Sequence, residues 1–310
     1  MLLKFDRGLT TMAVHAQGQE LATIMGMDRD DQGHRVVDYP LEFTRHVATF
    51  HDPVLITDYH RIGALGAEDP VLRDTVMALY GQRSRTTIYD GTRLDFEQAR
   101  HPGVWGPSID TLLCCRAFSK LDLLHAHHAI EIGAGSGFIT KYLLEHHPAI
   151  QRATMVDMMP GAILTCQENV MDPRARFYLG DGLEFLESVQ ADLIYSNPPY
   201  IPRPSSIDDN PYEGVFLLVQ LIESAPRTLR PGGSLVLNLS SLCLDTAIEA
   251  IERTGLRYTI VDEMTVPLKV FNVLNNPDWL SYLVDERGML AERRDGYDYW
   301  HTVSVLNITR

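Results

Sequence analysis

The chain has 310 residues, of which 45% are hydrophobic, and a formal net charge of −14. This length exceeds one minimal domain and suits a large α/β domain with a smaller second domain. The acidic balance disfavours general binding to nucleic-acid phosphates, although it leaves room for a local basic groove. A protein with a basic surface, or a small molecule, is the more favourable partner.

Apolar stretches fall short of membrane-spanning length, and the early charges of the N-terminal segment are not typical of a signal peptide. The four cysteines form no C-x-x-C pair, a pattern typical of unpaired thiols in a reducing compartment. We therefore expect a cytoplasmic protein without a membrane segment. His125, His127 and His128 could bind a metal, but no Cys or acidic partner is near, so a solvated loop and no metal site are predicted.

Residues 1–105 differ in pattern from the rest of the chain. Helices are predicted over residues 9–27, 41–48 and 70–80. Asp90-Gly91 between alternating apolar residues favours a tight turn, so residues 86–96 are predicted as a β-hairpin. Proline and glycine then punctuate residues 102–107, and we place the boundary between an N-terminal domain (1–105) and a second domain (106–310) there.

From residue 108 onward, apolar strands alternate with helices. Ser108 can cap a helix that begins at Ile109. Such alternation predicts a mostly parallel sheet with helices on both faces. Strands are expected at 129–132, 153–156, 176–179, 193–196, 234–239 and 302–308, helices near 138–147, 162–170 and 213–229, and a further helix and strand ending near 261.

Three glycines at alternate positions, Gly133, Gly135 and Gly137, connect the first of these strands to a helix. Glycine tolerates positive φ and lets a ligand approach the backbone, and the helix N-terminus beyond it presents N–H groups to an anionic group. The dinucleotide fingerprint G-x-G-x-x-G would need glycine at position 138, where the chain has Phe138. The pattern is instead G-x-G-x-G, preceded by the acidic Glu131. A structural tight turn is the simpler alternative.

Two acidic residues follow the next two strands. Asp157 ends the second strand, where a carboxylate can accept hydrogen bonds from both hydroxyls of a ribose. It could also cap the helix before Pro160. Asp181, between two glycines, follows the third strand, and a simple Asp-Gly turn explains it equally well.

The strongest signal is Asn197-Pro198-Pro199-Tyr200, which ends the fourth strand abruptly. Each proline fixes φ, removes an N–H donor and biases the preceding residue toward an extended shape, so the loop is stiff and its carbonyls act as acceptors. The Asn197 side-chain oxygen and the Pro198 carbonyl can each accept one N–H bond from an amide or aromatic amino group. Tyr200 can stack on such a planar group. A rigid loop that only closes a strand is the alternative.

These residues resemble the class I S-adenosylmethionine-dependent methyltransferases, and within them the HemK-type protein-glutamine methyltransferases. The narrower resemblance rests on Asn-Pro-Pro-Tyr-Ile-Pro at 197–202, the Pro-x-x-Asp-Thr run at 107–111 and Leu-Arg-Pro-Gly-Gly at 229–233. It implies an α/β, Rossmann-like, mostly parallel seven-stranded sheet and a smaller, mainly helical N-terminal domain for substrate recognition. It also implies S-adenosyl-L-methionine as cofactor and, as substrate, glutamine in the Gly-Gly-Gln loop of a release factor or in a ribosomal protein.

The resemblance also assigns roles to single residues. Asp181 would sit beside the adenine amino group of the cofactor, and Thr111 would line the cofactor side. The predicted catalytic residues are Asn197, Pro198, Pro199 and Tyr200. The predicted cofactor-binding residues are Glu131, Gly133, Gly135, Gly137, Asp157, Asp181, Asn197 and Thr111.

Departures from the family pattern concern the substrate more than the cofactor. Residues 204–210 replace the family's Asp-Gly-Gly segment, and Gly106-Pro107-Ser108 stands where Pro-Arg-Pro is usual. The tail 266–310 is longer than usual, and residues 1–85 match no part of the family. An N-methyltransferase of a nucleic-acid base or of a small molecule therefore stays open as an alternative. So does a non-catalytic S-adenosylmethionine-binding protein.

Overall fold

The structure, a computed structural model, describes residues 35–38, 85–96, 101, 104–205, 214–268, 270–274, 276–294 and 297–310. The helices predicted over 9–27, 41–48 and 70–80 lie outside these residues. The division of the chain near residue 105 stays a prediction.

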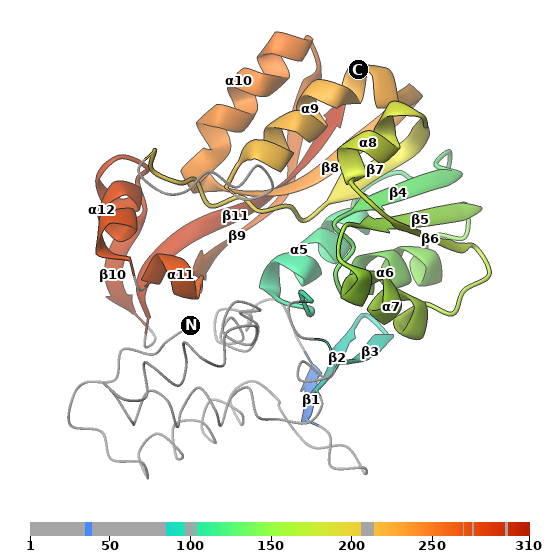
Figure 1. Cartoon of the computed structure of the whole chain (residues 1–310), viewed down its shortest axis with the longest axis horizontal. Helices are drawn as coiled ribbons and strands as arrows, with labels where there is room; N and C mark the ends of the chain where they lie inside the picture. Colours follow the sequence, from blue (N-terminus) through green and yellow to red (C-terminus); the bar gives the residue numbers. More distant parts are fainter. Residues whose placement is uncertain are drawn as a thin grey trace.

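The described residues form strands, α-helices and one short 3₁₀-helix, and Figure 1 labels the strands and the α-helices. The strands are β1 (Arg35–Asp38), β2 (Arg85–Tyr89), β3 (Thr92–Phe96), β4 (His128–Ile132), β5 (Arg152–Asp157), β6 (Ala175–Leu179), β7 (Ala191–Ser196), β8 (Leu229–Ser240), β9 (Arg257–Pro267), β10 (Leu290–Arg294) and β11 (Tyr297–Thr309). The helices are α5 (Ile109–Phe118), α6 (Phe138–His146), α7 (Pro160–Asn169), α8 (Gly182–Glu187), α9 (Phe216–Thr228), η2 (Ser241–Cys243), α10 (Leu244–Thr254), α11 (Phe271–Leu274) and α12 (Pro277–Asp285). Every strand and helix predicted from residue 108 onward is present, whereas α8, α11, α12 and β10 were not predicted.

The predicted hairpin is confirmed as β2 and β3, which pair antiparallel, with β1 added in parallel to β2. Asp90 and Gly91 form the turn with φ angles of 46° and 81°, the positive values that a tight hairpin turn requires. The Thr92 hydroxyl contacts Glu145 and His146 of α6. These contacts attach the hairpin to the larger sheet domain.

The larger sheet has eight strands in the order β10-β11-β8-β7-β4-β5-β6, with β9 pairing β11. Strands β4 to β8 run parallel, and β11 is antiparallel to β8, β9 and β10. The first strand of this sheet, β4, lies in the middle; β5 and β6 follow on one side of it, and β7 and β8 then lie on the other side (Figure 1). The carboxyl ends of β4 and β7 are therefore a topological switch point, where open α/β sheets bind ligands. The predicted mostly parallel α/β sheet is confirmed, and it exceeds the expected seven strands by the short β10.

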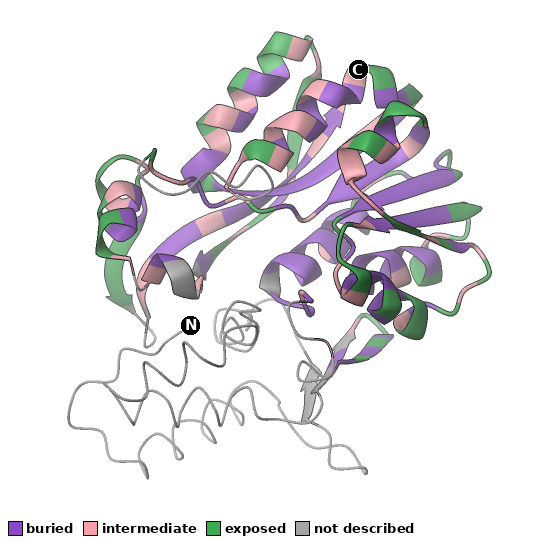
Figure 2. Ribbon diagram, viewed as in Figure 1, coloured by how far each residue is buried: buried purple, intermediate pink, exposed green. Residues whose placement is uncertain are grey.

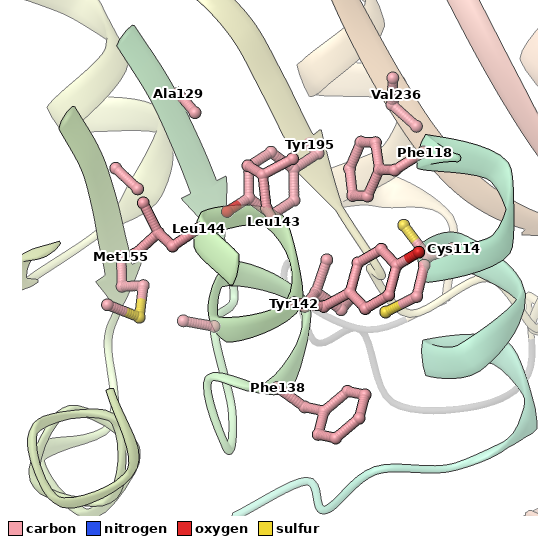
Figure 3. Close-up of a cluster of buried hydrophobic side chains, with 14 of the residues drawn as sticks. Cys114, Phe118, Ala129, Phe138, Tyr142, Leu143, Leu144, Met155, Tyr195 and Val236 are labelled. Atoms are coloured by element: carbon pink, nitrogen blue, oxygen red, sulfur yellow. The ribbon is translucent and has the colours of Figure 1, made fainter. Parts of the chain in front are cut away.

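Helices cover both faces of this sheet (Figure 1). On one face, α5, α6 and α7 enclose a core in which Phe118, Tyr142 and Tyr195 are fully buried (Figure 3). On the other face, α8, α9 and α10 enclose a second core, in which Leu221 of α9 and Ile194 of β7 are buried. All of β4 is buried, including its two polar residues His128 and Glu131, because helices cover both faces of this central strand. Figure 2 shows the buried strands between helices whose outer sides are exposed.

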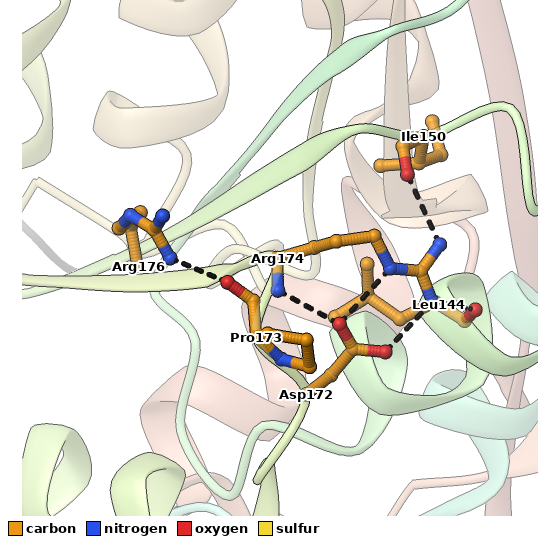
Figure 4. Close-up of polar contacts among 6 residues, drawn as sticks. All are labelled: Leu144, Ile150, Asp172, Pro173, Arg174 and Arg176. Atoms are coloured by element: carbon orange, nitrogen blue, oxygen red, sulfur yellow. Dashed lines mark hydrogen bonds and ion pairs between the residues drawn. The ribbon is translucent and has the colours of Figure 1, made fainter.

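A polar cluster ties the start of β6 to the end of α6 (Figure 4). The Arg174 guanidinium pairs with the Asp172 carboxylate at 2.7 Å and donates to the carbonyls of Leu144 at 2.6 Å and Ile150 at 3.0 Å. Its hydrogen bonds hold the pKa of Asp172 below the usual value. Because it precedes β6, this cluster lies at the opposite end of the strand from the switch point.

The tail after β9 adds a third, smaller core. Ile201 directly follows Asn197-Pro198-Pro199-Tyr200, called the proline segment below, and packs in this third core with Leu242, Leu268 and Trp279. The indole N–H of Trp279 in α12 donates to the carbonyl of Pro202 at 2.8 Å. The tail thus buttresses the loop that leaves β7. Among the helices of the described residues, none has the length and apolar character needed to cross a membrane.

Candidate active site

The glycine turn and the proline segment meet at the carboxyl ends of β4 and β7. Glu131 of β4 pairs with Tyr195 of β7 in parallel register. The Ser196 hydroxyl donates to the carbonyl of Ile132 at 2.6 Å and ties the last residue of β7 to the residue before the glycine turn. Two motifs that lie 64 residues apart in sequence are therefore neighbours at the switch point.

The glycine turn has the geometry of a ligand-binding loop. Gly133, Gly135 and Gly137 have φ angles of 73°, 52° and 78°. A Cβ atom on Gly135 would lie 2.9 Å from the carbonyl oxygen of Trp105, so only glycine lets the turn pack on that segment. A Cβ atom on Gly133 would meet no atom within 4 Å, so the turn is open there. Gly137 is the N-cap of α6 and supplies no side chain, which leaves the first N–H groups of the helix for an anionic group.

Asp157 holds this turn from the end of β5. Its carboxylate accepts hydrogen bonds from the N–H of Gly135 at 3.1 Å and from the N–H of Met159 at 2.9 Å. Burial raises the pKa of Asp157 above the usual value, while these hydrogen bonds lower it. The side chain remains partly exposed. It therefore positions the turn, and its contact with a ribose stays a prediction.

Thr111 and Asp181 both act as helix caps in this structure. The Thr111 hydroxyl accepts from the N–H of Ser108 at 3.1 Å at the start of α5. The Asp181 carboxylate accepts from the N–H of Leu183 at 2.7 Å at the start of α8. Helix capping thus accounts for the local contacts of Thr111 and Asp181. Their contact with a cofactor stays a prediction.

Glu131 lies in the core beside the turn, with 1% of its surface exposed. Its carboxyl accepts from the hydroxyl of Thr140 in α6, which also contacts the Tyr195 hydroxyl at 2.5 Å. Burial raises the pKa of Glu131 to about 8, against the opposing effect of the Thr140 hydrogen bond. At neutral pH the folded protein therefore holds a proton on this carboxyl.

We expect the free energy of unfolding to fall as the pH rises from 4.5 to about 8, because the folded Glu131 keeps its proton in this range and the unfolded one does not. The loss amounts to a few kcal/mol, since one pKa unit corresponds to about 1.4 kcal/mol. Urea unfolding of the wild type and Glu131→Gln at several pH values measures it. The variant should lack this slope, whereas Glu249→Gln, which changes an exposed carboxyl on α10, should retain it. Equal slopes for the wild type and Glu131→Gln would contradict the prediction.

The proline segment places an unpaired acceptor at the switch point. The side-chain NH₂ group of Asn197 donates to Asp110 at 2.9 Å, and the Tyr200 hydroxyl donates to the same carboxylate oxygen at 2.9 Å. The side-chain oxygen of Asn197 is buried and accepts no hydrogen bond from the part of the chain that the structure describes. Pro198 is buried and Pro199 is exposed. A buried acceptor without a partner marks a position where a ligand can supply the donor.

Asp110 is the residue of this site to which the sequence assigned no role. It lies in the first turn of α5 and is 3% exposed. Besides binding Asn197 and Tyr200 through its carboxylate, it accepts through its backbone carbonyl from the side chain of Asn238 in β8 at 2.7 Å. The signal in the sequence that could identify it is the Pro-x-x-Asp-Thr run at 107–111, which contains Asp110.

The histidine cluster before β4 divides in two. His125 and His127 are exposed, as the predicted solvated loop requires. For His128 that prediction is wrong, because it is the first residue of β4, is 5% exposed and contacts the Arg152 side chain at 3.1 Å. Burial lowers the pKa of His128. The described residues hold no group of three His, Cys, Asp or Glu side chains that could bind a metal ion.

Residues 107–250 match the family model of the methyltransferase small domain. A release factor glutamine methyltransferase of Geobacter sulfurreducens is 33% identical over 147 residues, which cover 42% of this chain and 51% of that protein. A 4-amino-L-phenylalanine/4-methylamino-L-phenylalanine methyltransferase of Streptomyces pristinaespiralis is 27% identical, over 50% of this chain and 60% of that protein. A ribosomal RNA large subunit methyltransferase G of Magnetococcus marinus is 29% identical, over 49% of this chain and 40% of that protein.

The strand order, the glycine turn and the matched segment make residues 107–250 similar to the core of a class I methyltransferase domain, a class whose cofactor is S-adenosylmethionine. Within that class, the segment is similar to release factor glutamine methyltransferases, such as the protein of Geobacter sulfurreducens. The alignments span between 40% and 60% of the relatives' own length. The open, positive-φ turn and the start of α6, where no side chain caps the first N–H groups, fit S-adenosylmethionine.

Proposed function

We propose that this protein is an S-adenosylmethionine-dependent N-methyltransferase that acts on a planar amide or amino nitrogen, and that its acceptor is a glutamine side chain of a protein. The observation that carries the proposal is the buried, unpaired side-chain oxygen of Asn197 beside the glycine turn. Bound S-adenosylmethionine supplies a methyl group on a sulfonium, which a nitrogen held in line can attack.

In this proposal, residues at the carboxyl ends of β4 and β5 hold the cofactor. The turn from Gly133 to Gly137 and the start of α6 present backbone N–H groups to an anionic group such as a carboxylate. Asp157, already bonded to the turn, accepts from the ribose hydroxyls. Asp181, which follows the neighbouring strand β6, would lie beside the adenine of the cofactor in this proposal.

The proline segment holds the substrate nitrogen. The side-chain oxygen of Asn197 and the carbonyl of Pro198 each accept one N–H bond, which orients the nitrogen lone pair and stabilises the charge that develops on nitrogen. The Tyr200 ring supports the planar group from its face. Burial and Asp110 raise the pKa of Tyr200 well above its usual value, so its hydroxyl stays protonated at neutral pH and does not serve as a base. The site therefore suits a neutral nitrogen that brings its own N–H donors.

A protein glutamine is favoured among such acceptors for two reasons. The relative from Geobacter sulfurreducens is named a release factor glutamine methyltransferase. The net charge of −14 suits a basic protein surface better than a nucleic-acid backbone. The aromatic amine of the Streptomyces relative's substrate and an exocyclic base amine are also planar, so a small molecule or an RNA is the second candidate. In this proposal residues 1–105 recognise the substrate.

Tritiated-methyl transfer tests the proposal. The purified chain is incubated with labelled S-adenosylmethionine and either a cell extract or a purified bacterial release factor with a Gly-Gly-Gln loop. Label should enter the release factor, should be removed from the extract by protease and not by nuclease, and should be absent when the loop glutamine is alanine. Label that nuclease removes would identify a nucleic-acid base as the methyl acceptor, and label in the low-mass fraction would identify a small molecule. Failure of the wild type to bind S-adenosylmethionine in calorimetry would overturn the whole assignment.

A further inference from the structure

Asp110 sits where three elements converge, and its two carboxylate oxygens have separate partners. One oxygen accepts from the Ser108 hydroxyl and from the N–H of Thr111 at 3.1 Å, both at the start of α5. The other accepts from the side chains of Asn197 and Tyr200, each at 2.9 Å. The start of α5 therefore fixes the rotation of this carboxylate, and its second oxygen faces the proline segment.

We infer that Asp110 is a positioning residue that sets which way the Asn197 side-chain amide faces, an inference that rests on the proposed function of Asn197 as acceptor. A carboxylate has only acceptors, so the amide must direct its NH₂ group toward Asp110. The reversed amide would place two oxygens against each other. The Asn197 oxygen is therefore held on the opposite side, where it is buried and unpaired within the described chain.

The same argument predicts the effect of one isosteric change. In Asp110→Asn, the Thr111 N–H and the Ser108 hydroxyl still require an acceptor, so the new amide keeps its oxygen toward α5. Its NH₂ group then faces Asn197, whose amide reverses to accept from it. The NH₂ group of Asn197 now meets the substrate N–H, and two donors oppose each other.

Methylation kinetics test this relay, with the release factor and S-adenosylmethionine as probes. We expect Asp110→Asn to lower kcat/KM for the release factor at least about 100-fold and to change the Kd for S-adenosylmethionine less than about threefold. The double variant Asp110→Asn with Asn197→Asp restores an acceptor toward the substrate, because one oxygen of the introduced carboxylate binds the new amide and the other faces outward. It should recover at least about tenfold of the loss. Asp122→Asn makes the same change at an exposed position after α5 and should behave as wild type.

A second readout needs no substrate. The side-chain amide signals of Asn197, assigned by their absence in Asn197→Ala, should shift in Asp110→Asn because the bond to a carboxylate is lost. Unchanged signals, or kcat/KM within about threefold of wild type, would overturn the inference, as would a double variant no better than Asp110→Asn. Absence of methyl transfer by the wild type would count against the proposed function instead, and the amide signals would still decide the role of Asp110.

Discussion

Replacing Asn197 with alanine is expected to lower kcat by about 10²–10³-fold while the Kd for S-adenosylmethionine changes less than about twofold. The change removes the unpaired acceptor at the switch point but leaves the glycine turn, Asp157 and α6 in place. It also takes one donor from the buried Asp110, at a cost to stability of about 1–3 kcal/mol. Steady-state methylation, calorimetry with the cofactor and thermal unfolding separate these three effects.

Gln190→Ala is the matched control for that experiment. Gln190 carries the same amide group, is exposed and precedes β7, at the opposite end of the strand from Asn197. Its loss should leave kcat and cofactor affinity at wild-type values. An Asn197→Ala protein that is folded and retains full turnover would show that the amide does not hold the substrate.

Replacing Asp157 with alanine is expected to weaken S-adenosylmethionine binding by at least about 100-fold, which corresponds to about 2.7 kcal/mol. Two losses combine, because the carboxylate both anchors the Gly135 N–H and is the predicted ribose acceptor. A hydrogen bond to an ionised group contributes more than a neutral one, so either loss alone is substantial. Calorimetric titration of the folded variant with the cofactor measures the change.

Asp172→Ala provides the comparison for Asp157. It also removes a hydrogen-bonded carboxylate, but in the cluster with Arg174 at the far end of β6 (Figure 4). Stability should fall, because Arg174 loses its partner, while the cofactor Kd stays within about twofold of wild type. Equal affinities of Asp157→Ala and the wild type for S-adenosylmethionine would show that Asp157 does not bind the cofactor.

Features with a local cause could be predicted from the sequence. The hairpin follows from Asp90-Gly91, and the strand–turn–helix at Gly133 follows from a buried apolar strand and alternate glycines. The end of β7 follows from two prolines that cannot continue a ladder. In each case a few consecutive residues determine the backbone, so the pattern is visible without the fold.

Features with a distant cause could not. The contacts of Asp110 join residues 87 and 90 positions away, so its role depends on how α5 packs against the end of β7. In the tail, α12 begins at an Asn-Pro cap that the sequence does contain, but its burial depends on the core that it forms with Ile201. The prediction of a solvated loop was wrong for His128 because the histidine cluster continues without a break into the buried strand β4.

The order of strands has a consequence for synthesis of the protein. β11 follows β8, β9 and β10 in the chain, yet it lies inside the sheet and joins them. During translation, β4 to β8 and the glycine turn can form while β8 still presents an open edge. At about 5–20 residues per second, that edge waits several seconds for β11 to emerge. The strands β4 to β8 and the glycine turn can therefore form early in a nascent chain. The loop after β7 gains its hydrogen bond from Trp279 only when the tail folds, so a chain stalled on the ribosome before the tail lacks that support.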